Sequence, residues 1–75
     1  MMPRLPRVAA RELIRALHRA GWLTNRQTGS HVHLSLPDGS CQTVVPNHTG
    51  DLKLGTLANI LRDIGWTADE LRRRL

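Results

Sequence analysis

The stretch "TGSHVHLSL", residues 28–36, decides the fold, because apolar and polar side chains alternate along it after a glycine. Successive side chains of a β-strand point to opposite faces of the sheet, so the valine and the two leucines share one face. The two histidines and Ser35 share the other face. The pattern therefore predicts a strand with one buried face, and it predicts that His31 and His33 lie on the face open to solvent.

Apolar residues recur at helical spacing on both sides of this stretch, which is typical of the buried stripe of an amphipathic helix. The first set predicts a helix that ends at Gly21, and the second set predicts a helix that ends at Gly65. Thr67 and Glu70 then form a capping-box pattern, in which each side chain accepts from the other residue's backbone N–H. A short third helix to about Arg74 is therefore expected. The two stripes are Ala10, Leu13, Ile14 and Leu17, and Leu57, Ile60, Leu61 and Ile64.

Two further strands are predicted beside the first. Residues 22–28, WLTNRQT, form a short segment in which polar residues are interspersed with apolar ones, which is typical of a half-buried strand. Residues 41–46, CQTVVP, follow the turn sequence PDGS and predict a third strand. Val44 and Val45 both qualify for the core, so the register of this strand stays open.

The order of these elements predicts the fold class. Helix, three strands and helix, with a short terminal helix, predict an α+β fold with a three-stranded antiparallel meander and helices on one sheet face. A chain of 75 residues is long enough for one domain with a small core. We therefore expect residues 1–75 to form a single domain, in which residues 1–7, with two prolines, are an extended lead-in.

The charge balance favours a polyanionic partner. Eleven lysines and arginines against six acidic residues give a net charge of +5, and ten of the eleven cations are arginine. Arginine binds phosphate through a planar fork, which favours nucleic acid, although a solvated basic surface has the same composition. The single Cys41 cannot form an internal disulfide, and no signal peptide or membrane span is predicted. We therefore expect a cytoplasmic protein that does not enter a membrane.

His31 is the candidate general acid or base, because an imidazole takes and gives protons near neutral pH. Gly29 before it allows a sharp turn and the close approach of a phosphate, and Ser30 offers a hydroxyl and a backbone N–H to phosphate oxygens. The same local pattern is also typical of a plain surface histidine at the start of a strand. His33 is interpreted as a solvent-facing strand residue.

Other polar residues near these histidines in sequence have two interpretations. Arg26 and Lys53 are candidates to stabilise charge that develops on a phosphate, and each is also typical of a solvated side chain. His31 and His33 with Cys41 and His48 contain the ligand types of a zinc site. Because the paired CxxC spacing of a strong zinc motif is missing, no metal is predicted.

The sequence resembles the HicA family of bacterial toxin mRNA interferases over most of its length. The resemblance rests on "LPRVAARELIRALHRAGW" at residues 5–22, "RQTGSHVHLSLPDG" at 26–39 and "VVPNHTGDLKLGTLANILRDIGWTADEL" at 44–71. The string R-Q-x-G-S-H and the string V-P-x-H followed by G-T-L are specific in combination. The chain departs from the family at Leu54, where a proline is frequent, and at Ala9, where a serine or threonine often caps the helix.

The resemblance implies a fold like the double-stranded-RNA-binding domain and a ribonuclease of mRNA whose catalytic histidine is His31. It also implies neutralisation by a HicB-type antitoxin that covers the site. In the expected mechanism, His31 takes the proton of an RNA 2′-hydroxyl, which attacks the adjacent phosphate. That histidine alone, or water with it, carries the second proton, and Lys53 or Arg26 stabilises the phosphate charge. Gly29, Ser30 and His48 support RNA binding or the transition state, and no metal or small-molecule cofactor is required.

Two alternatives remain open from the residues. The same fold binds double-stranded RNA by shape and phosphate contacts, and His31 then has no chemical role. "LANILRDIGWTADELRRRL", residues 57–75, also has the outline of a helix-turn-helix with arginines for DNA.

Overall fold

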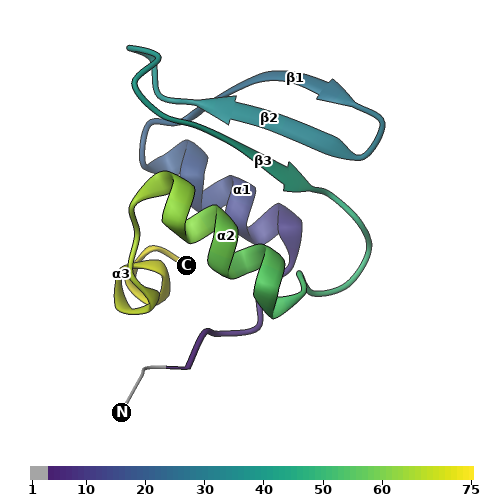
Figure 1. Ribbon diagram of the computed structural model, residues 1–75, viewed down its shortest axis with the longest axis vertical. Helices are drawn as coiled ribbons and strands as arrows, with labels where there is room; N and C mark the ends of the chain where they lie inside the picture. The colour runs from purple at the N-terminus through teal and green to yellow at the C-terminus, as the bar shows by residue number, and fades with distance from the viewer. Residues whose placement is uncertain (1–3) are drawn as a thin grey trace.

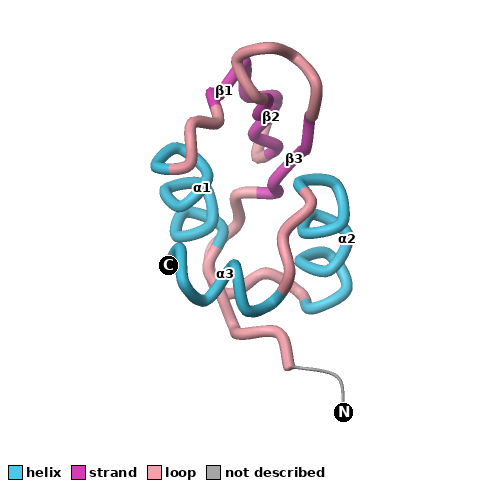
Figure 2. Tube along the Cα trace, turned by 90° about the vertical axis from the view of Figure 1, so that its left-hand side faces the viewer, coloured by secondary structure: helices cyan, strands magenta, loops and turns pink. Residues whose placement is uncertain are grey.

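The computed structural model describes residues 4–75 of the chain. This part contains three strands and three helices. The strands form an antiparallel sheet in the order β1-β2-β3. Helices α1 and α2 lie against one face of it, and α3 lies on their far side, away from the sheet (Figures 1 and 2). The predicted α+β fold is confirmed. The elements are α1 (Ala10–Arg19), β1 (Leu23–Thr28), β2 (His31–Ser35), β3 (Gln42–Pro46), α2 (Leu54–Ile64) and α3 (Ala68–Arg74).

The alternation in β2 sets the core, as predicted. Val32 and Leu34 are buried under the helices, whereas His31 is exposed and His33 is partly buried. Leu36 lies just past the end of the strand and packs against the core as a partly buried residue. The apolar stripes of α1 and α2 meet this face, since burying apolar area is the main favourable term in folding.

The register of β3 resolves the choice between its two valines. Val45 pairs with Val32 and is fully buried, whereas Val44 pairs with His33 and is 40% exposed. Thr43 shares the core face with Val45, and its hydroxyl donates to the carboxylate of Asp63 in α2 at 3.3 Å. The buried hydroxyl is therefore satisfied, which avoids the cost of an unpaired polar group in the core.

The prediction of a half-buried first strand is wrong, because every residue of β1 is exposed. This strand is an edge of the sheet, and α2 packs against the opposite edge strand, β3. A register shift between Thr24 and Arg26 leaves Asn25 as an extra residue, whose side-chain amide donates to Ser35 Oγ at 2.9 Å. The apolar anchor is Trp22, which precedes the strand and is buried.

Helices α1 and α2 both end at a Gly-Trp pair. Gly21 has φ +97°, and the N–H of Trp22 donates to the carbonyl of Leu17 at 2.9 Å. Gly65 has φ +76°, and the N–H of Trp66 donates to the carbonyl of Leu61 at 3.0 Å. Glycine adopts this left-handed conformation without steric cost, and the returning N–H satisfies a helix-end carbonyl. Both predicted helix ends are confirmed.

Only one half of the predicted capping box at α3 is formed. Thr67 Oγ1 accepts from the backbone N–H of Glu70 at 3.1 Å. The carboxylate of Glu70 does not return to Thr67, because it pairs with Arg74 at 3.2 Å. At α1, the opposite half is present: the N–H of Ala9 donates to Glu12 Oε1 at 3.0 Å, while alanine has no side-chain acceptor to offer.

The N-terminal lead-in is described from Arg4 onward, and residues 1–3 lie outside the described part. Residues 4–7 contain no regular helix or strand, and Leu5 packs against the core. Val8 is buried, and its carbonyl accepts from the N–H of Leu52 at 2.8 Å. The chain just before α1 is thereby joined to the loop that precedes α2.

The register of β3 predicts unequal effects of two neighbouring substitutions. Val45→Ala should lower the free energy of unfolding by about 2 kcal/mol, because it removes buried methyl groups and leaves a cavity. Val44→Ala should change it by less than about 0.5 kcal/mol, since that side chain faces solvent. Urea unfolding followed by circular dichroism measures both. A larger loss for Val44→Ala would mean that β3 is shifted by one residue.

Candidate functional site

A two-residue turn places His31 at the edge of the hairpin. Thr28 pairs with His31, so Gly29 and Ser30 alone connect β1 to β2. Gly29 has φ +59° and Ser30 does not have a positive φ, which is the combination found in type II′ hairpin turns. The backbone therefore requires glycine here whatever else the residue does. His31 follows as the first residue of β2 and is exposed.

The loop after β3 returns to this turn. The N–H of Asn47 donates to the carbonyl of Ser30 at 2.7 Å. His48 Nε2 lies 3.4 Å from Ser30 Oγ, and the N–H of His48 donates to the carbonyl of Pro46 at 3.1 Å. His31 is itself the register partner of Pro46. Three of the predicted residues, Ser30, His31 and His48, are thus gathered at one end of the sheet.

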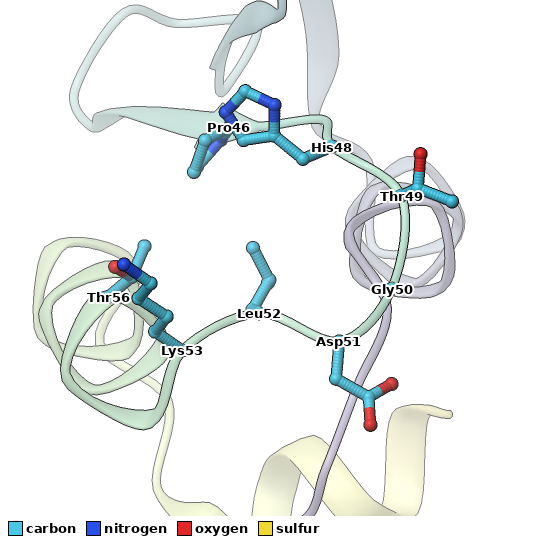
Figure 3. A pocket seen from close by; sticks show the side chains of 8 residues that line it. All are labelled: Pro46, His48, Thr49, Gly50, Asp51, Leu52, Lys53 and Thr56. Atoms are coloured by element: carbon cyan, nitrogen blue, oxygen red, sulfur yellow. The ribbon is translucent and has the colours of Figure 1, made fainter.

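His48 borders two hollows in the surface. One has a volume of about 450 Å³, and Lys53 lines it together with His48. In Figure 3 the side chain of Leu52 points into this space toward Pro46 and His48, while the carboxylate of Asp51 points away. The second, of about 420 Å³, is lined by Ala9, Arg11, Asn47, His48, Thr49, Gly50 and Asp51. The loop that carries His48 therefore separates two spaces, each with a cation in its wall.

Arg26 lies away from His31, although it shares the open face. It is the register partner of His33, two residues along the strands from the row of Thr28, His31 and Pro46. Of the two predicted cations, Lys53 lies nearer to His48 and Arg26 lies nearer to His33. The structure thus divides the predicted residues into a group around the turn and one cation farther along the sheet.

Arg11 is a candidate that the sequence pattern did not single out. It begins the exposed face of α1, and it reaches the loop because Ala9 bridges to Asp51 in an antiparallel pair. This contact arises from tertiary pairing, so the helical spacing in the sequence could place Arg11 only on the polar face of the helix.

Within residues 4–75 the ion pairs closer than 4 Å are both in α3, Arg72 with Asp69 and Arg74 with Glu70. Arg11, Arg26 and Lys53 therefore present their charge to solvent.

The zinc set considered from the sequence is not assembled. Across the described residues, no three side chains of His, Cys, Asp or Glu come together. His18, which was not in that set, has its Nε2 at 2.8 Å from Thr24 Oγ1.

The terminal helix packs against the rest of the chain and pairs part of its charge internally. Leu71 is fully buried, and the guanidinium of Arg74 lies 4.9 Å from the centre of the Trp66 ring. The carbonyl of Arg74 accepts from Arg19 of α1 at 2.7 Å. Two of the three consecutive arginines, Arg72 and Arg74, are in ion pairs. These contacts give α3 the role of a packing element under α1 and α2.

Comparison with known families gives the class of the protein. A family model described as the HicA toxin of bacterial toxin-antitoxin systems matches residues 10–66, which include both main helices, the sheet and the loop that carries His48. The chain is thus the toxin component of such a system. It belongs to the HicA toxin family. No curated protein matches it. Among residues 4–75, no helix has the length and apolar character needed to cross a membrane.

The backbone conformations of Gly29, in the turn, and Gly55, in α2, predict opposite effects of substitution by alanine. Gly29→Ala should lower the free energy of unfolding by about 1–2 kcal/mol, because a Cβ is strained at a positive φ. Gly55→Ala should raise it by about 0.5–1 kcal/mol, because this glycine lies in α2 without a positive φ and with open space around it. Thermal and urea unfolding of both variants test this. An unchanged stability for Gly29→Ala would show that the turn does not depend on glycine.

Proposed function

We propose that this chain is a metal-independent endoribonuclease that cleaves mRNA with His31 as its catalytic histidine. The observation that carries the proposal is the position of His31: exposed, first in β2, and directly after the Gly29-Ser30 turn. An exposed imidazole beside backbone and hydroxyl donors has what a general base needs at a phosphodiester. Membership of the HicA toxin family supports the same activity.

The chemistry follows from the groups around the turn. His31 removes the proton of an RNA 2′-hydroxyl, and the 2′-oxygen attacks the adjacent phosphorus. The bond from phosphorus to the 5′-oxygen breaks, and that oxygen gains a proton. The products are a 2′,3′-cyclic phosphate and a free 5′-hydroxyl, so DNA, which lacks the 2′-hydroxyl, is not cleaved. Gly29 and Ser30 hold phosphate oxygens through the turn and the serine hydroxyl. His48 supports RNA binding or the transition state from the facing loop.

The cations contribute by stabilising charge. Attack by the 2′-oxygen concentrates negative charge on the nonbridging phosphate oxygens, and a fixed cation nearby lowers the energy of that state. Lys53, in the wall of the hollow beside His48, is better placed for this than Arg26, which is in the row of His33. We therefore assign Lys53 to transition-state support and Arg26 to binding of RNA along the open sheet face.

Two partners complete the proposal. The first is mRNA, which the toxin meets in the cytoplasm. The second is a HicB-type antitoxin, which neutralises the toxin by covering His31 and the turn before it. A surface that binds RNA phosphates is basic, so we expect the antitoxin to present acidic side chains to it. No metal or small-molecule cofactor takes part in this scheme.

A positively charged protein with the same fold could also bind RNA without cleaving it. The exposed arginines favour RNA binding in either case. Shape and phosphate contacts suffice to hold double-stranded RNA, and they require no proton transfer. Turnover separates the two functions, because only the nuclease produces new RNA ends.

His31→Ala should reduce mRNA cleavage in EDTA by roughly 100- to 10,000-fold, the usual contribution of a general acid or base. His33→Ala is the matched control, because it removes the next histidine on the same face and should cleave within about threefold of the unmodified chain. Mapping of product ends should find 2′,3′-cyclic phosphates, and a 2′-O-methyl group at the scissile position should stop the reaction.

Equal cleavage by the unmodified chain and His31→Ala would exclude His31 as the catalytic residue. Binding of RNA by both without cleavage by either would replace the nuclease with the binding module. Cleavage of the 2′-O-methylated substrate would exclude attack by the 2′-oxygen.

A further inference from the structure

The proposed cleavage needs two proton transfers at opposite sides of one phosphorus atom. A base removes the 2′-hydroxyl proton, and the departing 5′-oxygen must gain a proton, because an alkoxide is a poor leaving group. His31 can make one of these transfers directly. Water can carry the second proton, but a positioned group whose charge changes near neutral pH transfers it more efficiently, and among side chains histidine is the one whose ordinary pKa lies there.

We infer that His48 is the general acid of the reaction and that it protonates the departing 5′-oxygen. The inference rests on the proposed nuclease function and adds a second catalytic histidine to it. The chain has four histidines. His18 is next to Thr24 at the other end of β1, and His33 is in the row of Arg26. His48 is the histidine that the fold returns to the turn before His31.

The position of His48 is fixed by its backbone. Asn47, the residue before it, donates to the Ser30 carbonyl at 2.7 Å, and the N–H of His48 donates to the Pro46 carbonyl at 3.1 Å. Farther along the loop, the N–H of Leu52 donates to the Val8 carbonyl at 2.8 Å. The loop is thus anchored on both sides of His48, once to the hairpin turn and once to the chain before α1. A proton donor needs such fixed placement to act on one bond.

The side chain of His48 remains available for substrate. It is exposed, and its only hydrogen-bond partner among the described residues is Ser30 Oγ, at the long distance of 3.4 Å. A contact of this length is weak and is readily replaced by a phosphodiester oxygen. The hollows of about 450 and 420 Å³ on the two sides of the loop leave room for RNA beside the imidazole.

The charged residues that line the hollows beside His48 come from its own loop and from α1, and the carboxylate of Asp51 points away from the imidazole. Asp51 and Lys53 follow it in the loop, and Arg11 is in the wall of the second hollow. Arg11 would attract a phosphate next to the scissile one, while Lys53 supports the charge on the scissile phosphate as proposed above. The imidazolium of His48 would then be left to act on the 5′-oxygen.

The step is balanced as follows. The 2′-hydroxyl proton moves to His31 as the bond from the 2′-oxygen to phosphorus forms. The bond from phosphorus to the 5′-oxygen breaks, and the Nε2 proton of the His48 imidazolium moves to that oxygen. The products are the 2′,3′-cyclic phosphate and the 5′-hydroxyl, with His31 protonated and His48 neutral. Exchange of one proton at each imidazole with water restores the starting state.

A change of leaving group tests this assignment. Two RNA substrates are compared that differ only at the scissile bond, one with the normal 5′-oxygen and one with sulfur in its place. A thiolate departs without protonation, so a missing general acid matters only for the oxygen substrate. His48→Ala should slow cleavage of the oxygen substrate by roughly 100- to 10,000-fold and cleavage of the sulfur substrate by less than about fivefold. His31→Ala should slow both substrates.

The control variants distinguish a general-acid role of His48 from a structural role. His48→Gln can hydrogen-bond to Ser30 but cannot donate as an imidazolium, so it should behave as His48→Ala does. His18→Ala removes an exposed histidine of the other sheet end and should leave both rates unchanged. Thermal unfolding and RNA binding of each variant verify that the fold and the substrate site are intact.

Three results would overturn the inference. Equal slowing of both substrates by His48→Ala would assign His48 to binding or positioning, and full activity of that variant on the oxygen substrate would remove it from the reaction. Both results leave the proposed nuclease in place. Absence of His31-dependent cleavage of either substrate by the unmodified chain would overturn the nuclease and the inference together.

Discussion

The burial of Val32 and Leu34 beneath α1 and α2 is the constraint on which the rest of the structure depends. A strand has a period of two, so placing these side chains in the core forces His31 and His33 to the opposite face. A shift of one residue would bury two imidazoles and expose two apolar side chains, at a cost of several kcal/mol. The energetics of the core therefore hold His31 in solvent.

Much of this could be predicted because the determining signals are local. Alternation within β2, helical spacing before and after it, and glycines at the helix ends each depend on a few adjacent residues. The exposure of β1 could not be predicted in this way, because WLTNRQT has the composition of a half-buried strand, and it is exposed because α2 packs against the other edge strand, β3. The choice between Val44 and Val45 likewise depended on pairing with β2. Glu70 departed from the capping box because Arg74, one turn later, attracts its carboxylate more directly.

The candidate site shows the same division between local and long-range information. Gly29, Ser30 and His31 are adjacent in sequence, so the pattern identifies them together. His48 and Lys53 were predicted as site residues, but their relation to the turn depends on contacts between distant segments, such as the backbone hydrogen bonds of Asn47 with Ser30 and of Leu52 with Val8. Arg11 was missed because it comes to the loop only through the bridge between Ala9 and Asp51. Backbone pairings between distant segments leave no periodic trace in the sequence.

These pairings also explain how so small a protein can hold a loop in place. Loops are commonly mobile because their backbone groups bond to water, and mobility is unfavourable for a group that must meet one atom of a substrate. Here residues 47–53 are anchored to the hairpin at Ser30 and to Val8, just before α1. Both anchors use backbone atoms, so the side chains of His48 and Lys53 remain free for other contacts. The loop can therefore be well positioned at its backbone while its polar side chains stay in solvent, and a binding surface for a polyanion needs both properties.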